Sequence, residues 1–245
     1  MAFTVVLLAL LIQWFINLEG RYRHPEWFNA YYQWMKRHFK VAQDWLELII
    51  VVVPPLVVLV VLLLILHLAW GDVGRFILNL IVVWYCLDYD GVKARAKKAG
   101  DLKAFLLMAF EKVFTMIFWF TLTGALGVVL YYLVVSFIDN IQASETHDKN
   151  LLKLLGLIQG IMEWVPLRLV GITFALVGNF GHGFAAVRRD FLKGIRQTRE
   201  QAITWAMASL EESDNQFHTG LIMVDRALLL WLVVLALVSM GAWVG

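Results

Sequence analysis

Polar and apolar positions fall into long blocks along this chain rather than the short periods of a soluble helix or strand. Apolar runs recur over its 245 residues and are separated by charged connections rich in aromatic residues. A membrane-spanning helix needs about 20 predominantly apolar residues, with 17–25 usual. The pattern therefore predicts six membrane segments, at 2–18, 48–70, 74–88, 113–138, 154–187 and 227–244.

The composition agrees with this pattern. Hydrophobic residues make up 61% of the chain and charged residues 16%, whereas a soluble domain is about 45–50% apolar and about 25% charged. We therefore predict an all-α, polytopic helical membrane protein with amphipathic cytoplasmic helices. It forms a single integral membrane domain over residues 1–245. The third segment is the shortest, and Pro54-Pro55 predict a kink in the second.

The positive charges test this topology. The connections 19–47, 89–112 and 188–226 contain 17 of the 21 Lys and Arg residues. The connections 71–75 and 139–153 contain three, and Arg168 lies within a segment. The positive-inside rule places the three basic loops in the cytoplasm and the other two outside. With six crossings, both termini then face outward.

The cytoplasmic connections provide few candidates for chemistry. Aromatic and basic residues interleave over 21–47, which favours an amphipathic helix at the membrane interface over an aromatic platform for a ligand. Basic residues at 93–98 can meet anionic lipid headgroups. Asp88 and Asp90 could hold a divalent cation, but two nearby aspartates are common, so we expect neither a metal nor a cofactor. A single cysteine excludes an internal disulfide, and a net charge of +2 does not indicate nucleic-acid binding.

The fifth segment contains the most unusual run. Residues 151–187 would form one helix about 55 Å long, which exceeds a hydrocarbon core of about 30 Å. We predict a break at Pro166. The first part, 151–164, would lie on the outer surface or tilt against another helix, and the second part, 167–187, would span.

Four residues around that proline are the main candidates for a ligand site: Glu163, Trp164, Pro166 and Arg168. A charge at the bilayer centre costs about 3 kcal/mol on insertion scales. One hypothesis is a structural lock, in which Arg168 pairs with Glu163 across a kink or binds carbonyls of a neighbouring segment. The other is a polar pocket in which Arg168 binds a phosphate or carboxylate. Arg168 follows Trp164 by four positions, which predicts a cation–π contact.

His182 is a further candidate. It stands among Gly178, Gly181 and Gly183, a spacing that is not a phosphate-binding fingerprint. We consider an interfacial capping group and a ligand contact, and the first is the more common role.

The run EWVPLRLVGITFALVGNFGHG, residues 163–183, resembles the acidic/Asn-Trp-x-Pro-x-Arg-Leu motif of the AmpE family, which is related to the CobD/CbiB proteins of cobalamin biosynthesis. The stretches FEKVFTMIFWFTLTGALG and VDRALLLWLVVLALVSMGAW resemble other membrane segments of that superfamily. The carried-over motif residues are Glu163, Trp164, Pro166 and Arg168. In the fourth-segment motif only Glu111 remains of the carboxylates, and the chain has no Gly-Lys dipeptide for a Walker A loop.

The resemblance implies a protein of the bacterial inner membrane with both termini in the periplasm. Its implied role is a modulator or sensor linked to β-lactamase induction and cell-wall recycling, without catalytic residues. Its implied partners are membrane lipids and a cell-wall-derived or other anionic ligand. The alternatives are a CobD/CbiB-like membrane enzyme acting on an amphiphilic anionic substrate, and a small transporter.

Overall fold

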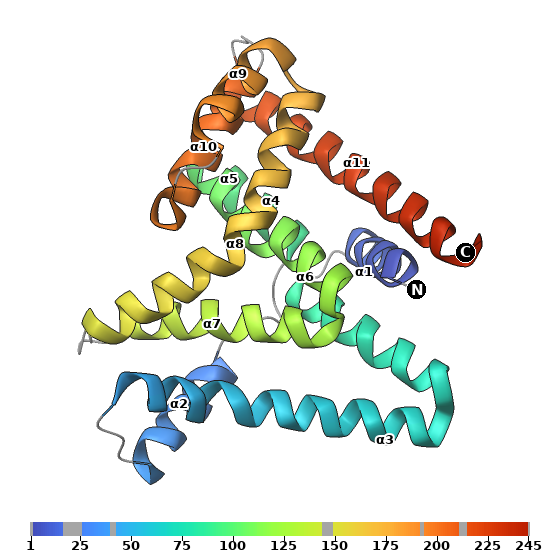
Figure 1. Cartoon of the computed structure of the whole chain (residues 1–245), viewed down its shortest axis with the longest axis vertical. Coiled ribbons are helices and arrows are strands. Elements are labelled where there is room, and N and C mark those ends of the chain that lie inside the picture. Colours follow the sequence, from blue (N-terminus) through green and yellow to red (C-terminus); the bar gives the residue numbers. More distant parts are fainter. Residues whose placement is uncertain are drawn as a thin grey trace.

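The computed structural model describes residues 2–16, 26–39, 43–143, 149–191, 194–210 and 215–244. These residues form helices and contain no strand, which confirms the all-α fold (Figure 1). The elements are α1 (Ala2–Ile16), α2 (Glu26–His38), α3 (Asp44–Cys86), α4 (Tyr89–Ala99), α5 (Leu102–Ala109), the π-helical turn η1 (Phe110–Phe114), α6 (Thr115–Thr123), α7 (Ala125–Ala143), α8 (Lys149–Val177), α9 (Phe180–Asp190), the 3-10 turn η2 (Ile195–Gln197), α10 (Thr198–Ser209) and α11 (Gln216–Val244).

Within the described residues, five helical stretches are long and apolar enough to cross a membrane. They cover 44–99, 102–123, 125–143, 149–177 and 216–241, and α1 adds a shorter apolar helix. The chain is therefore a polytopic helical membrane protein. The helices differ from the predicted segments at two glycines and at Pro166.

Gly71 and Gly124 reverse the chain. Both have positive φ, at 61° and 70°, a conformation that a side chain disfavours and glycine adopts readily. At Gly71 the helix α3 folds back on itself (Figure 1), so the second and third predicted segments are the two arms of one hairpin. At Gly124 the chain turns from α6 into α7. The single fourth span predicted at 113–138 is therefore wrong, because hydropathy alone does not reveal a turn between two apolar helices.

The break predicted at Pro166 is also wrong, because α8 remains helical from Lys149 to Val177. Proline frees the carbonyl four residues before it, here that of Met162. The indole Nε1 of Trp119, in α6, donates to that oxygen at 3.1 Å. A neighbouring helix thus completes the hydrogen bonding that the proline interrupts, as burial in an apolar environment requires.

The same arrangement recurs at the tandem prolines of α3. Pro54 and Pro55 free the carbonyls of Ile50 and Val51, and α3 continues through both positions. The Tyr31 hydroxyl of α2 lies 3.4 Å from the first of these oxygens and 3.1 Å from the second. The phenol therefore docks α2 onto the point where α3 lacks its own hydrogen bonds.

The fifth predicted segment ends earlier than 187. Gly178 and Asn179 separate α8 from α9, and the Asn179 side chain caps the first turn of α9 by accepting from the His182 amide at 3.2 Å. The Asn179 amide donates to the Ser209 carbonyl, the last residue of α10, at 2.8 Å. The end of α8 is therefore fixed by a contact with α10 that no local pattern predicts.

The helix α10 runs parallel to α8 and lies against its glycines. A Cβ atom at Gly160 or Gly171 of α8, or at Gly178 just after it, would collide with Ile195 of η2 or with Trp205 or Ser209 of α10, respectively. The helix α9 contacts both of the parallel helices, so α8, α9 and α10 pack against one another as one group. In Figure 1 this group rises across the view, whereas α7 and the first arm of α3 run nearly horizontally.

The apolar core has two parts that meet in α8. One cluster includes Leu151, Leu155 and Met162 and extends over α1, α2, α3, α6 and α7. The other begins at Leu167 and extends over α4, α5, α10 and the start of α11. The charged residues around position 163 therefore lie at the boundary between two hydrophobic clusters.

Within the described residues of 21–47, the predicted amphipathic helix is present as α2. Phe28, Tyr32 and Met35 share one face and are at most 5% exposed, packed on α3 and α7. Trp27 and Trp34 remain 42% and 53% exposed. One face of α2 thus packs on other helices of the protein. Its exposed indoles remain available to the membrane interface, where we predicted that this helix acts as an anchor.

Trp119→Phe should lower the stability of the purified protein by about 1–2 kcal/mol, because the Met162 carbonyl loses its donor. Thermal unfolding in detergent measures this change. Trp45→Phe, at an indole that is 54% exposed, is the matched control and should have little effect. In a Pro166→Ala background the backbone amide of residue 166 can donate to the Met162 carbonyl. Trp119→Phe should therefore lower the stability less in that background. An equal loss in both backgrounds would contradict the capping role.

Candidate functional site

Glu163 is the centre of a buried polar cluster, here called the Glu163 cluster: Glu111, Tyr131, Glu163 and Arg199. The Glu163 residue is 1% exposed. Its Oε1 atom accepts from the Tyr131 hydroxyl and from Nη2 of Arg199, both at 2.5 Å, and its Oε2 atom accepts from Nε of Arg199 at 2.6 Å. The guanidinium therefore binds the carboxylate through two nitrogens, the geometry in which arginine binds carboxylates most strongly.

Arg199 also binds a second carboxylate. Its Nη2 atom donates to Oε2 of Glu111 at 2.6 Å. Burial by itself would lower the pKa of Arg199, but the hydrogen bond and charge of Glu163, together with the charge of Glu111, raise that pKa above its ordinary value. The guanidinium therefore stays charged and holds two carboxylates close together.

The π-helical turn positions Glu111. In η1 the Thr115 amide bonds to the Phe110 carbonyl, five residues back. A π turn inserts an additional residue into an α-helix, and such turns are frequent at functional sites. The turn joins α5 to α6 and lies where the two apolar clusters meet. Glu111 thereby reaches Arg199 while Phe110 and Phe114 stay buried.

A small pocket of about 70 Å³ lies beside this turn. Lys112 and Asp139 line it from η1 and α7, and Asp88 lines it from the start of α4. The remaining lining residues are Tyr85, Cys86, Met116, Tyr132, Val135 and Ser136. Asp88 is paired with Arg95 at 2.6 Å. The pocket thus combines carboxylates with one lysine and can accommodate only a small group.

Arg168 binds backbone carbonyls. Its Nε atom donates to the Phe191 carbonyl at 2.7 Å and its Nη1 atom to the Trp164 carbonyl at 2.8 Å. The guanidinium carbon lies 3.9 Å from the centre of the Trp164 ring, so the predicted cation–π contact is confirmed. Arg168 is 3% exposed, and these contacts hold the end of α9 against α8.

The structure separates the predicted site residues. Glu163 takes Arg199 as its ion-pair partner rather than Arg168. Pro166 is buried within α8. His182 is exposed in the first turn of α9, whereas Arg168 contacts the residue that follows that helix. An 11-residue helix at 1.5 Å per residue puts about 15 Å between those two ends. His182 therefore does not join the Glu163 cluster.

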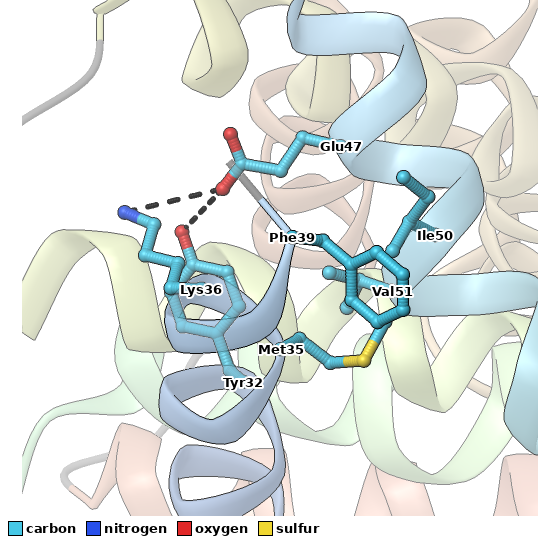
Figure 2. Close-up of a pocket in the computed structure, with 7 residues that line it drawn as sticks. All are labelled: Tyr32, Met35, Lys36, Phe39, Glu47, Ile50 and Val51. Carbon is cyan, nitrogen blue, oxygen red and sulfur yellow. Dashed lines mark hydrogen bonds and ion pairs between the residues drawn. The ribbon is translucent and has the colours of Figure 1, made fainter. Parts of the chain in front are cut away.

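A second pocket, of about 280 Å³, lies between α2 and the start of α3 (Figure 2). Glu47 accepts from the Tyr32 hydroxyl at 2.7 Å and lies 3.9 Å from Nζ of Lys36. Met35, Phe39 and Val51 form an apolar wall beside these groups. Residues 40–42, which connect the two helices, lie outside the described residues.

The Glu163 cluster is suited to coupling helices rather than to bond-breaking chemistry. Its carboxylates, phenol and guanidinium bind one another, and they come from α7, α8, η1 and α10. Among the described residues no group of three His, Cys, Asp or Glu side chains could hold a metal ion. An ion pair of this kind fixes the relative positions of the elements that carry it.

Three members of the cluster were not candidates from sequence. Arg199 is one of six basic residues in its connection, and Tyr131 is one aromatic residue in an apolar run. Glu111 was noted only through the family resemblance. A lone acid in an apolar run, such as Glu163, signals a missing partner, but no sequence spacing identifies a partner 36 residues away.

Arg199→Gln should destabilise the folded protein by about 3 kcal/mol, because it leaves two buried carboxylates without their cation. Glu163→Gln should cost less, since Arg199 keeps Glu111. Lys97→Gln is the control, because Lys97 is exposed on α4 and charges at such positions contribute about 1 kcal/mol or less. Thermal unfolding in detergent gives all three values. The double variant Glu163→Gln/Arg199→Gln should be more stable than Arg199→Gln alone, and the reverse order would exclude a coupled pair.

Comparisons of the chain with protein-family models, with curated proteins and with solved structures found no match.

Proposed function

We propose that the protein is an inner-membrane modulator or sensor that resembles AmpE and acts in β-lactamase induction and cell-wall recycling signalling. The observation that carries the proposal is the bidentate pair of Glu163 with Arg199. It joins α10, in the basic connection 188–226, to α8, which contains the Trp-x-Pro-x-Arg motif. A change in one of these two helices is transmitted directly to the other.

The second motif residue that supports this role is Arg168. Its two carbonyl contacts fasten the end of α9 to α8. The motif residues therefore hold the α9–α10 region in place at two points, one through an ion pair and one through backbone hydrogen bonds. A signalling partner, or a cell-wall-derived or other anionic ligand, that displaces either contact would shift this region relative to the membrane helices.

A revised topology belongs to this proposal. Lys112 and Asp139 line one pocket, so the end of α7 lies on the same face as the basic loop 89–112. Lys149 and Lys153 then join the basic side, which carries 19 of the 21 Lys and Arg residues. Only Arg75, beside the α3 bend, and Arg168 remain. The positive-inside rule places that basic side in the cytoplasm.

In this topology both ends of α8 lie on the cytoplasmic side, so this continuous helix does not cross, although it is long and apolar enough to do so. The six crossings are α1, the two arms of α3, the α5–α6 helix, α7 and α11. An even number keeps both termini in the periplasm, as the sequence predicted, although the helices that cross are different. The domain boundaries are unchanged, with one integral membrane domain over 1–245.

A CobD/CbiB-like enzyme is the second candidate. The observation that favours it is the pocket that places Lys112 beside Asp88 and Asp139. A lysine and carboxylates at one site can bind and transfer protons to a polar substrate. Its volume of about 70 Å³ admits only part of an amphiphile, so the modulator is preferred.

The function is tested in a bacterium with an inducible β-lactamase. Deletion of the gene should change the ratio of induced to basal β-lactamase activity, and the wild-type gene should restore it. Arg199→Gln, matched in membrane abundance by immunoblot, should not restore it, because α10 is no longer held to α8. Lys97→Gln, at an exposed position of α4, should restore it fully. An unchanged ratio in the deletion strain would rule out the proposed role.

The revised topology is tested by cysteine labelling in a Cys86→Ala background. An impermeant thiol reagent applied to intact spheroplasts should label Asp72→Cys, beside the α3 bend. Gln142→Cys and Lys97→Cys should react only after permeabilisation, since both positions lie on the basic side. Labelling of Gln142→Cys in intact spheroplasts would instead place 139–153 outside.

A further inference from the structure

Two hollows on the α8 surface meet at one residue, and together they match an amphiphile. The first has a volume of about 560 Å³ and is lined by Ile172, Phe184, Val187, Arg188, Arg189 and Phe191. The second, of about 360 Å³, lies among α6, α8 and α11. Ile172 lines both. A basic hollow thus continues into an apolar groove.

The apolar groove faces outward along α11. It extends from Leu230 to Val238, which is about 12 Å of helix. Leu176 and Val238, on its two walls, are 57% and 60% exposed. A groove with these walls lies open to the hydrocarbon layer and fits an acyl chain. It requires no partner protein to cover it.

The basic hollow has the complementary charge for a phosphate. Arg188 is exposed, and among the described residues it has no ion-pair partner. Arg189 has 73% of its side chain exposed and lies 3.4 Å from Asp190. Guanidinium groups bind phosphate oxygens through paired donors. Arg188, and the donors of Arg189 other than the Nη2 group that contacts Asp190, are therefore available to a headgroup.

The helix α9 has the arrangement of an interfacial helix. Phe180 and Phe184 stack, with ring centres 5.3 Å apart, and are 54% and 44% exposed. Arg188 follows Phe184 by four positions, so all three residues share one face. Aromatic rings at headgroup depth followed by a cation are typical of a helix that lies at the surface of an anionic membrane.

We propose that one anionic phospholipid binds at this junction, with its phosphate on Arg188 and Arg189 and an acyl chain in the groove between α8 and α11. The occupant is a membrane lipid rather than a free phosphate, because the basic hollow and the apolar groove adjoin at Ile172. The site is separate from the Glu163 cluster and does not depend on the function proposed above.

The test uses the full-length protein in neutral detergent, with its thermal midpoint followed by tryptophan fluorescence. Dioleoyl phosphatidylglycerol should raise the midpoint at a lower concentration than dioleoyl phosphatidylcholine does. Glycerol 3-phosphate, which carries the phosphate without chains, should have no effect. Equal stabilisation by the two lipids, or stabilisation by glycerol 3-phosphate alone, would overturn the proposal.

Variants then locate the site. Arg188→Ala/Arg189→Ala should raise the concentration of phosphatidylglycerol needed for half of the shift by about thirtyfold, which corresponds to about 2 kcal/mol for two headgroup contacts. Lys97→Ala/Lys98→Ala removes two exposed charges from α4 and should leave the response unchanged. Ile172→Trp, which fills the junction, should weaken the response to phosphatidylglycerol while both arginines remain. A wild-type response from the double arginine variant would place lipid binding elsewhere.

Discussion

The fold depends on one ion pair between two helices that are far apart in sequence. Glu163 is almost completely buried, and a carboxylate in that position requires a cation and hydrogen-bond donors. Arg199 provides both, and Tyr131 supplies one more donor. Satisfying this carboxylate brings α10 alongside α8 and brings the π turn close to both. The arrangement of α8, α10 and η1 therefore follows from the need to neutralise a single buried acid.

A related constraint explains how prolines persist inside long helices. Pro166 and the pair Pro54-Pro55 each leave carbonyls without an amide partner, yet α8 and α3 continue through them. Trp119 and Tyr31 donate to those oxygens from other helices. Each bond satisfies an acceptor in an apolar environment and also fixes how two helices cross. The prolines therefore act as docking points in the described structure rather than as breaks.

The sequence was most informative where one physical quantity dominates. Run length and composition determine that the chain forms apolar helices, and the all-α membrane fold follows from them. The cation–π contact between Trp164 and Arg168 follows from helical spacing alone. The need of Glu163 for a partner also follows from its apolar surroundings. These properties are local, so a short stretch of sequence contains everything that decides them.

Tertiary structure decided which groups meet. The turn at Gly124, the carbonyl donor for Pro166 and the choice of Arg199 over Arg168 each depend on atoms from another helix. Hydropathy assigned 113–138 to one span because both sides of Gly124 are equally apolar. The sequence pattern assigned Arg199 to a loop, because the charge of a residue does not indicate which distant residue it contacts. Sequence by itself thus determined the kind of helices and the demand for a polar partner, whereas packing determined which partner satisfies that demand and on which side of the membrane helices it lies.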